Sequence, residues 1–125
     1  MTTLQSFNNL INLATAISQF EGFYKKGSRA QRNNNPGNLR AYNSTQRRDN
    51  EGFRVFLDPI EGFTALLSQI LLNVSRGLTL RQFFSGSSTY SGYAPGAQAE
   101  NYIQFVKQKT RFDESVPLEY YINLS

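Results

Sequence analysis

One carboxylate stands where an apolar side chain is expected. In the stretch "SQFEGFYKKG", Glu21 lies between Phe20 and Phe23 at the end of a predicted helix, and it projects onto the same side as Leu10 and Ile17. Burial there and the negative end of the helix dipole would both raise its pKa. A carboxyl group that keeps its proton beside apolar walls, which Phe20 and Phe23 could form, suits a general acid. The alternatives are a buried Arg or Lys partner, or a bend that leaves the group exposed.

The composition limits the chemistry that the chain can perform. It contains no cysteine and no histidine, which excludes disulfides, thiolate metal sites, cysteine nucleophiles and the commonest general base. Catalysis would have to use carboxylates, tyrosine, lysine or hydroxyl groups. With 125 residues, 39% of them hydrophobic and 18% charged, we expect residues 1–125 to form one globular domain.

The charge balance favours a polyanionic partner. Thirteen Lys and Arg residues exceed nine Asp and Glu residues, and the excess lies in the first half of the chain. Such a field suits nucleic acid, an acidic lipid surface or an anionic cell-wall polymer. No recognition helix and no aromatic sheet platform is evident, so we do not expect nucleic-acid binding. The sequence has neither a run of about 20 apolar residues nor the pattern of a signal peptide, so we expect no membrane insertion.

Helices account for most of the predicted structure, because apolar residues recur at three-and-four spacing. Asp58 as N-cap, Pro59 at the first position and Gly77 beyond the end frame one helix, which we expect to be central and buried. Thr79 can cap a short helix, and Gly22 can end the first. The predicted helices span residues 4–20, 59–76, 80–84, 97–110 and 117–124.

Two short strands complete the prediction. Residues 39–42 and 53–56 flank the polar stretch "NSTQRRDNEG", which predicts a small hairpin. The Pro-Gly step at residues 36–37 fits a type II turn, and residues 85–96 are too rich in Gly and Ser for regular structure. Helices with a small hairpin, and without alternating strand-helix units, predict an α+β fold that is mostly helical.

Several stretches together resemble a known family. "AISQFEGFYKKGSRAQRNNNPGNLR", "FRVFLDPIEGFTALLSQI" and "YAPG" followed by "AENYIQFV" are similar to the lysozyme-like lytic transglycosylases of phages and bacteria. Those small proteins pair a Glu-Gly helix end with the asparagine-rich "RNNNPGNLR" pattern, which is the most specific part of the resemblance. The similarity covers about residues 14–118, nearly the whole chain.

The resemblance implies a glutamate-centred cleft between a helical lobe and a small β-hairpin lobe. The family cleaves the β-1,4 bond between N-acetylmuramic acid and N-acetylglucosamine in peptidoglycan. Its glutamate, matched here by Glu21, protonates the leaving oxygen and then acts as base while the muramoyl 6-hydroxyl attacks, which gives a 1,6-anhydro product. Such enzymes need no metal and no second catalytic carboxylate, so the resemblance implies that the chain uses no metal and no cofactor.

Two other functions stay open. A lysozyme-like hydrolase (muramidase) would use a second carboxylate, about 5 to 5.5 Å or about 6.5 to 9.5 Å from the first. Asp49, Glu51 and Asp58 are the nearest in sequence, although Asp58 is better explained as a helix cap. The other alternative is a non-catalytic glycan-binding component of a virion or secretion machine.

Asparagine, arginine and tyrosine side chains are the candidate substrate-binding groups. Asn34, Asn35 and Asn38 offer amide donors and acceptors to sugar hydroxyl and N-acetyl groups, or they form turns. Asn38 and Arg40 could steady Glu21 or contact substrate, although Arg40 could instead pair with a carboxylate of the hairpin.

Tyr93 and Tyr102 offer flat faces for sugar rings. The resemblance suggests that Tyr102 faces the cleft and bonds the catalytic acid, while Tyr93 lies at the rim; packing in the core is the alternative for both. As an endolysin-like monomer acting at the bacterial cell wall or periplasm, the chain would need a holin, a virion, a secretion apparatus or a removed leader for delivery.

Overall fold

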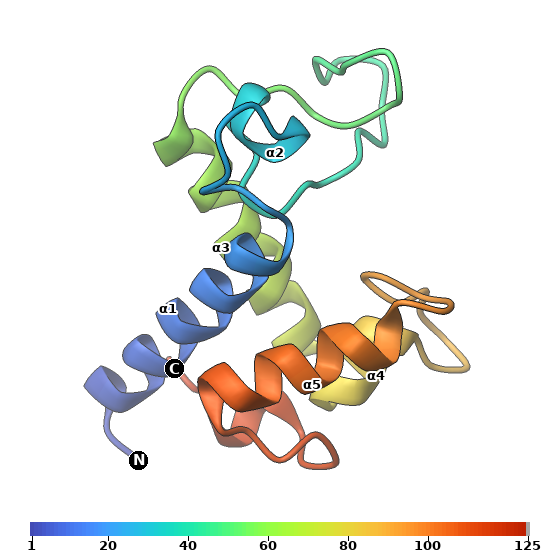
Figure 1. Cartoon of the computed structure of the whole chain (residues 1–125). Helices are drawn as coiled ribbons and strands as arrows, with labels where there is room; N and C mark the ends of the chain where they lie inside the picture. Colours follow the sequence, from blue (N-terminus) through green and yellow to red (C-terminus); the bar gives the residue numbers. More distant parts are fainter. Residues whose placement is uncertain (125) are drawn as a thin grey trace.

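Six helical segments follow one another along residues 1–124, the part of the chain that the computed structural model describes. Helices α1 and α3 lie side by side, and α5 packs across α1 with α4 beneath it (Figure 1). The helical segments are α1 (Thr3–Phe20), α2 (Arg29–Arg32), α3 (Pro59–Ser75), α4 (Leu80–Ser85), α5 (Ala99–Thr110) and the 3-10 helix η1 (Leu118–Tyr120). The mostly helical prediction is confirmed.

One hydrophobic core joins these helices. Leu13 and Ile17 of α1, Leu66 and Ile70 of α3, and Phe83 of α4 are almost completely buried in it. Side chains from α5 and from the C-terminal segment close the core: Tyr102, Ile103, Val106, Phe112, Leu118 and Ile122. Burial of large apolar side chains stabilises the fold by roughly 1.5–3 kcal/mol each before entropy is counted.

Capping residues define the helix ends much as the sequence predicts. The Asp58 side chain accepts a hydrogen bond from the backbone N–H of Glu61, 2.8 Å away, with Pro59 at the first position of α3. Thr79 and Gln82 form a reciprocal capping box at α4. Gly22 and Gly77 follow α1 and α3 with positive φ angles of 79° and 73°, which glycine adopts without strain.

The two predicted strands are reduced to isolated bridges. No continuous strand forms within residues 1–124; residues 39–42 and 53–56 share one isolated antiparallel bridge, Arg40 with Phe53, and a second bridge pairs Arg48 of the intervening loop with Arg54. Side chains hold this loop instead. The Asp49 carboxylate accepts hydrogen bonds from the backbone N–H groups of Glu51 and Phe53. It thus takes the place of some of the backbone hydrogen bonds that a hairpin would form between its strands.

Three helix predictions also need correction. Helix α3 buries one stripe only, because its face carrying Ile60 (78% exposed) and Leu72 (44%) lies at the surface. The C-terminal helix shrinks to η1, since Leu118 donates its N–H to Leu78 and the segment pairs with the chain before α4. Helix α5 begins at Ala99 rather than at residue 97. Helix α2, inside the basic loop, was not predicted.

A glycine lets the asparagine-rich segment pack on α3. A Cβ atom at Gly62 would stand 1.9 Å from the backbone oxygen of Asn34 and 2.7 Å from Pro36. The segment thus lies closer to the helix than any other residue would permit.

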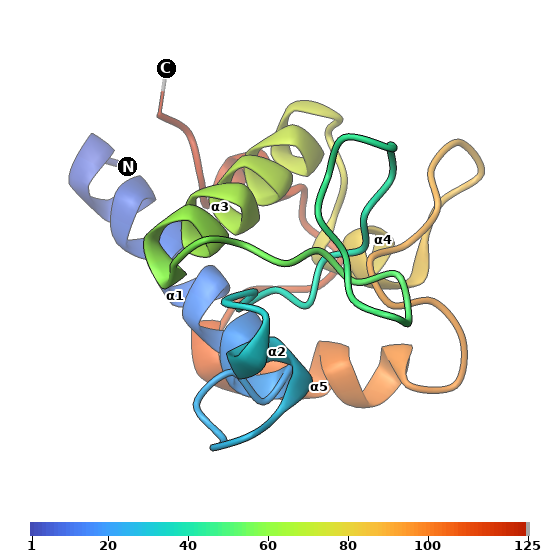
Figure 2. The same ribbon diagram turned by 90° about the horizontal axis from the view of Figure 1, so that it is seen from above.

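The loop over residues 41–52 and the loop before α5 extend on one side of the helices, whereas both termini lie on the opposite side (Figure 2). Among residues 1–124, no helix is long and apolar enough to cross a membrane.

Candidate active site

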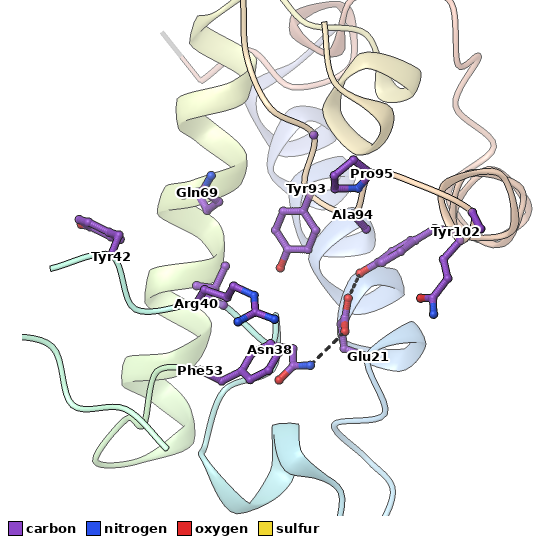
Figure 3. A pocket seen from close by; sticks show the side chains of 14 residues that line it. Glu21, Asn38, Arg40, Tyr42, Phe53, Gln69, Tyr93, Ala94, Pro95 and Tyr102 are labelled. Carbon is purple, nitrogen blue, oxygen red and sulfur yellow. Dashed lines mark hydrogen bonds between the residues drawn. The ribbon is translucent and has the colours of Figure 1, made fainter. Parts of the chain in front are cut away.

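Glu21 lies in a cleft of ≈ 760 Å³ whose walls come from distant parts of the chain. Asn38 and Arg40 line it from the asparagine-rich segment, and Tyr93 lines it from the loop before α5 (Figure 3). Tyr102 reaches it from α5. The structure therefore brings together five of the seven residues predicted for the site.

The end of α1 directs Glu21 into this cleft. Its backbone N–H still donates to the carbonyl of Ile17, 2.9 Å away, so the residue keeps the helical direction of the apolar stripe. Gly22 then turns the chain with a positive φ angle. The predicted position on the core-facing side of the helix is confirmed, but the carboxyl group faces a hollow rather than packed side chains.

Two side chains hold the carboxylate. The Tyr102 hydroxyl donates to Oε2 at 2.7 Å, and the Asn38 amide donates to Oε1 at 3.4 Å. Burial raises the pKa of Glu21 above its usual value, while these two hydrogen bonds act in the opposite direction. Within residues 1–124, no lysine or arginine pairs with Glu21. The direction predicted for the pKa is confirmed, and the alternative of a buried cationic partner is not what the structure contains.

Aromatic packing fixes the orientation of Tyr102. Its ring lies between those of Phe20 and Phe84, with centroid distances of 3.9 and 4.3 Å. Burial raises the pKa of the Tyr102 phenol well above its usual value, so the hydroxyl remains a donor at neutral pH. Phe20 supports the acid through this stack. Phe23 packs against Phe63, and neither Phe20 nor Phe23 lines the cleft, so these two rings do not form the walls expected beside Glu21.

Tyr93 ties the loop before α5 to the asparagine-rich segment. Its hydroxyl donates to the carbonyl of Gly37, and its backbone N–H is held by the carbonyl of Phe83 at 2.7 Å. A Cβ atom at Gly37 would meet the Tyr93 hydroxyl at 2.6 Å, so only glycine allows this approach. Because Asn38 is the next residue, the contact also positions the amide that bonds Glu21.

The turn before Asn38 is not of type II. The N–H of Asn38 donates to the carbonyl of Asn35 across the Pro-Gly step, but the positive φ angles belong to Asn34 (52°) and Asn38 (50°) and not to Gly37. Asparagine tolerates the left-handed region, so Asn34 and Asn38 adopt the positive φ angles. The glycine of this turn, Gly37, instead allows Tyr93 to come close.

Asn34 and Asn35 build the loop and do not line the cleft. The Asn35 amide is completely buried and donates to the carbonyls of Leu39 and Arg54, while its oxygen accepts the N–H of Leu39. The Asn34 amide donates to the carbonyl of Phe56. The turn-forming alternative therefore describes both residues: their amide groups donate to backbone carbonyls of the loop, and neither residue is placed to contact a ligand in the cleft.

Arg40 lines the cleft but forms no hydrogen bond or ion pair with Glu21 within residues 1–124. Its guanidinium group stacks over the Phe53 ring at 4.2 Å and donates to the backbone oxygen of Glu51. Sequence reasoning missed Phe53 and Gln69 as lining residues. Phe53 was assigned to a strand, and Gln69 lies on the polar side of α3, where no local pattern indicates a cleft.

The other candidate carboxylates are used elsewhere. Asp49 bonds Asn33 and lies 3.7 Å from Arg29, and Glu51 pairs with Arg29. Asp58 caps α3. Glu21 is the only carboxylate that lines the cleft among residues 1–124, and no group of three potential metal ligands occurs in that part of the chain. The arrangement can donate and accept one proton at a single carboxyl group.

We compared the chain with protein-family models, curated proteins and solved structures. No family model, no curated protein and no solved structure matches it significantly.

Proposed function

We propose that the protein is a peptidoglycan-degrading lytic transglycosylase in which Glu21 is the catalytic acid and then the base. The observation that carries this proposal is the single carboxylate in the cleft, with a pKa raised by burial and with two neutral hydrogen-bond donors on its two oxygens. A carboxyl group whose pKa is raised keeps its proton to higher pH and can give it to a glycosidic oxygen.

The reaction needs no second acid. Glu21 gives its proton to the glycosidic oxygen as the bond from C1 of N-acetylmuramic acid to the 4-oxygen of N-acetylglucosamine breaks. The resulting carboxylate then accepts the proton of the muramoyl 6-hydroxyl while that oxygen bonds to C1. The products are a free 4-hydroxyl group and a 1,6-anhydro end, and Glu21 is again protonated. The nucleophile comes from the substrate, so no water molecule is consumed.

The neighbours of Glu21 suit both steps. Tyr102 and Asn38 stabilise the carboxylate that forms after the first proton transfer, because both donate to it. Their lowering of the pKa opposes burial, which keeps the group able to lose as well as regain its proton. Tyr93, Phe53 and Arg40 give the cleft aromatic and polar walls of the kind that bind sugars.

The test is digestion of purified peptidoglycan sacculi, followed by mass spectrometry of the released muropeptides. We expect anhydro products from the wild type and a loss of about 10³-fold in rate for Glu21→Gln, which keeps the hydrogen-bonding shape without an acidic proton. Glu119→Gln is the matched control, since Glu119 lies exposed on η1, outside the cleft.

Each result has a distinct meaning. Unchanged activity in Glu21→Gln would overturn the assignment of the acid. Products with a hydrated reducing end would instead indicate a muramidase. Sacculus binding without any cleavage would indicate the non-catalytic glycan-binding function.

A further inference from the structure

A second hollow of ≈ 350 Å³ adjoins the cleft, on the side away from Glu21. It lies between the segment that follows the asparagine-rich stretch and the outer face of α3. Leu39, Arg40, Tyr42 and Gln69 line both hollows, so a ligand in the cleft can continue into this side groove. The side groove adds Arg54 from the loop and Ala65 and Leu72 from α3, among others.

The side groove carries positive charge without compensation. Arg40 and Arg54 line it, no acidic side chain does, and neither arginine forms an ion pair within residues 1–124. In the same loop both acids, Asp49 and Glu51, are bound to Arg29 and so do not neutralise these guanidinium groups.

Both guanidinium groups are oriented by stacking on aromatic rings. Arg40 stacks over Phe53 at 4.2 Å, and Arg54 stacks over the buried ring of Phe56 at 4.5 Å. Stacking leaves the edge of the guanidinium plane able to bind a carboxylate through two parallel hydrogen bonds. Pre-positioned arginines lose less conformational entropy on binding than flexible ones.

We propose that this side groove binds the peptide stem of N-acetylmuramic acid, with Arg40 and Arg54 pairing with its carboxylates. The inference rests on the proposed function in one respect: the glycan strand must occupy the cleft at Glu21. The stem branches from the sugar next to the scissile bond, so its carboxylates lie within reach of a groove that adjoins the cleft. Leu39, Ala65 and Leu72 give apolar contact for its alanine methyl groups. The protein therefore prefers strands that carry peptides over bare strands.

The test measures binding in the Glu21→Gln background, where cleavage does not interfere. Isothermal titration uses two tetrasaccharides that differ only in the stem, one with free carboxyl groups and one with all of them converted to amides. We expect the free-acid ligand to bind more tightly, and Arg54→Gln to weaken it about five- to tenfold while leaving the amidated ligand within about twofold. Arg54→Lys keeps the charge but loses the paired N–H donors, so its affinity should lie between those of the wild type and Arg54→Gln.

Arg76→Gln is the matched control. Arg76 also stacks over an aromatic ring, that of Tyr90 at 4.1 Å, forms no ion pair within residues 1–124 and lies outside both hollows. Its replacement should leave both affinities unchanged. Melting curves of every variant show whether the loop remains folded.

Three outcomes would overturn the proposal. One is an equal loss of affinity for the two ligands in Arg54→Gln. Another is equal affinity of the wild-type groove for both ligands. The third is competition by inorganic phosphate or a teichoic-acid polymer as strong as that of the stem, which would indicate a general anion site.

The two proposals can fail separately. Binding that depends on Arg54 in a protein that does not cleave sacculi would refute only the catalytic proposal. Cleavage with no effect of Arg54→Gln would refute only the side groove.

Discussion

Burial and hydrogen bonding act against each other at Glu21. Burial raises the pKa of the carboxyl group, whereas the Tyr102 hydroxyl and the Asn38 amide lower it. The acid-then-base role that we propose for Glu21 needs this balance, because a fully isolated carboxyl group would hold its proton too tightly for the second step. Tyr102 is the stronger of the two partners by distance, 2.7 Å against 3.4 Å for Asn38.

Replacing Tyr102 by Phe should raise the pKa of Glu21 further. The variant keeps the ring between Phe20 and Phe84 but removes the donor that favours the carboxylate. We expect a stability loss of about 0.5–1.5 kcal/mol, and an alkaline limb of the pH–rate profile that moves to higher pH. Carbon-13 NMR titration of labelled Glu21 measures the pKa without relying on activity.

Tyr120→Phe is the control for this experiment, since Tyr120 is 67% exposed on η1. It should leave the titration of Glu21 unchanged. A Glu21 pKa that falls or stays constant in Tyr102→Phe would contradict the assigned role of the hydroxyl group.

At the residue scale, helical periodicity was enough to find Glu21. The same periodicity could not say whether the carboxyl group meets a cation or a hollow, because that depends on Asn38 and Tyr102, 17 and 81 residues further along the chain. The family resemblance suggested Tyr102 as a partner, whereas Asn38 was a candidate from its amide chemistry alone. Asn35 shows the limit of residue type alone, since a buried amide and a substrate-binding amide look the same in sequence.

At the scale of elements, the ends of the helices were predicted better than the pairing of the two short strands. Thr79, Asp58 and Gly77 act within a few residues of their own position, so local chemistry determines them. The hairpin depended on pairing between segments more than ten residues apart. In this region the Asp49 carboxylate accepts the backbone N–H of Phe53, and the Asn35 amide donates to the backbone carbonyl of Arg54. In a regular hairpin, such backbone groups would bond to the opposite strand.

Gly62 gives a prediction that opposes helix propensity. In a helix interior, Gly→Ala ordinarily adds about 1 kcal/mol of stability. Here the new methyl group would stand 1.9 Å from the Asn34 carbonyl, so the asparagine-rich segment would have to move away from α3. We expect Gly62→Ala to lower the free energy of unfolding by about 1–3 kcal/mol and to reduce activity, because Asn38 moves with the segment.

Ser68→Ala is the comparison variant, since Ser68 is exposed on the same helix. It should stabilise slightly or have no effect. Chemical denaturation of both variants measures whether the change in the free energy of unfolding has opposite signs. A Gly62→Ala protein that is more stable than the wild type would refute the close contact.

At the scale of the whole molecule, the site is a meeting point of segments that share little local structure. The end of α1, the asparagine-rich segment, the loop before α5 and α5 itself each contribute to one cleft. The contact between Tyr93 and Gly37 joins two of them directly. The charge excess lies on the loop side of this cleft, where Arg40 and Arg54 remain without carboxylate partners within residues 1–124. Neither the meeting point nor the side groove is visible in any single stretch of sequence.

The buried acid should also make the whole protein less stable at neutral pH. Because the folded-state pKa of Glu21 is raised above its ordinary value of 4.5, folding favours the protonated form. The stability that protonated Glu21 adds to the folded state is fully present below its unfolded-state pKa. This stability is lost as the pH rises through the higher folded-state pKa of Glu21.

Glu21→Gln should remove this loss of stability at high pH, because its side chain does not ionise. Its amide oxygen can still accept the hydrogen bond from Tyr102. We expect the variant to be about 0.5–2 kcal/mol more stable than the wild type at pH 7 and to show little difference near pH 4. Urea unfolding at both pH values measures the difference, with Glu119→Gln expected to show no such change. A gain of equal size at both pH values would mean that the charge of Glu21 is not its source, and would remove the physical basis for a proton held in the cleft.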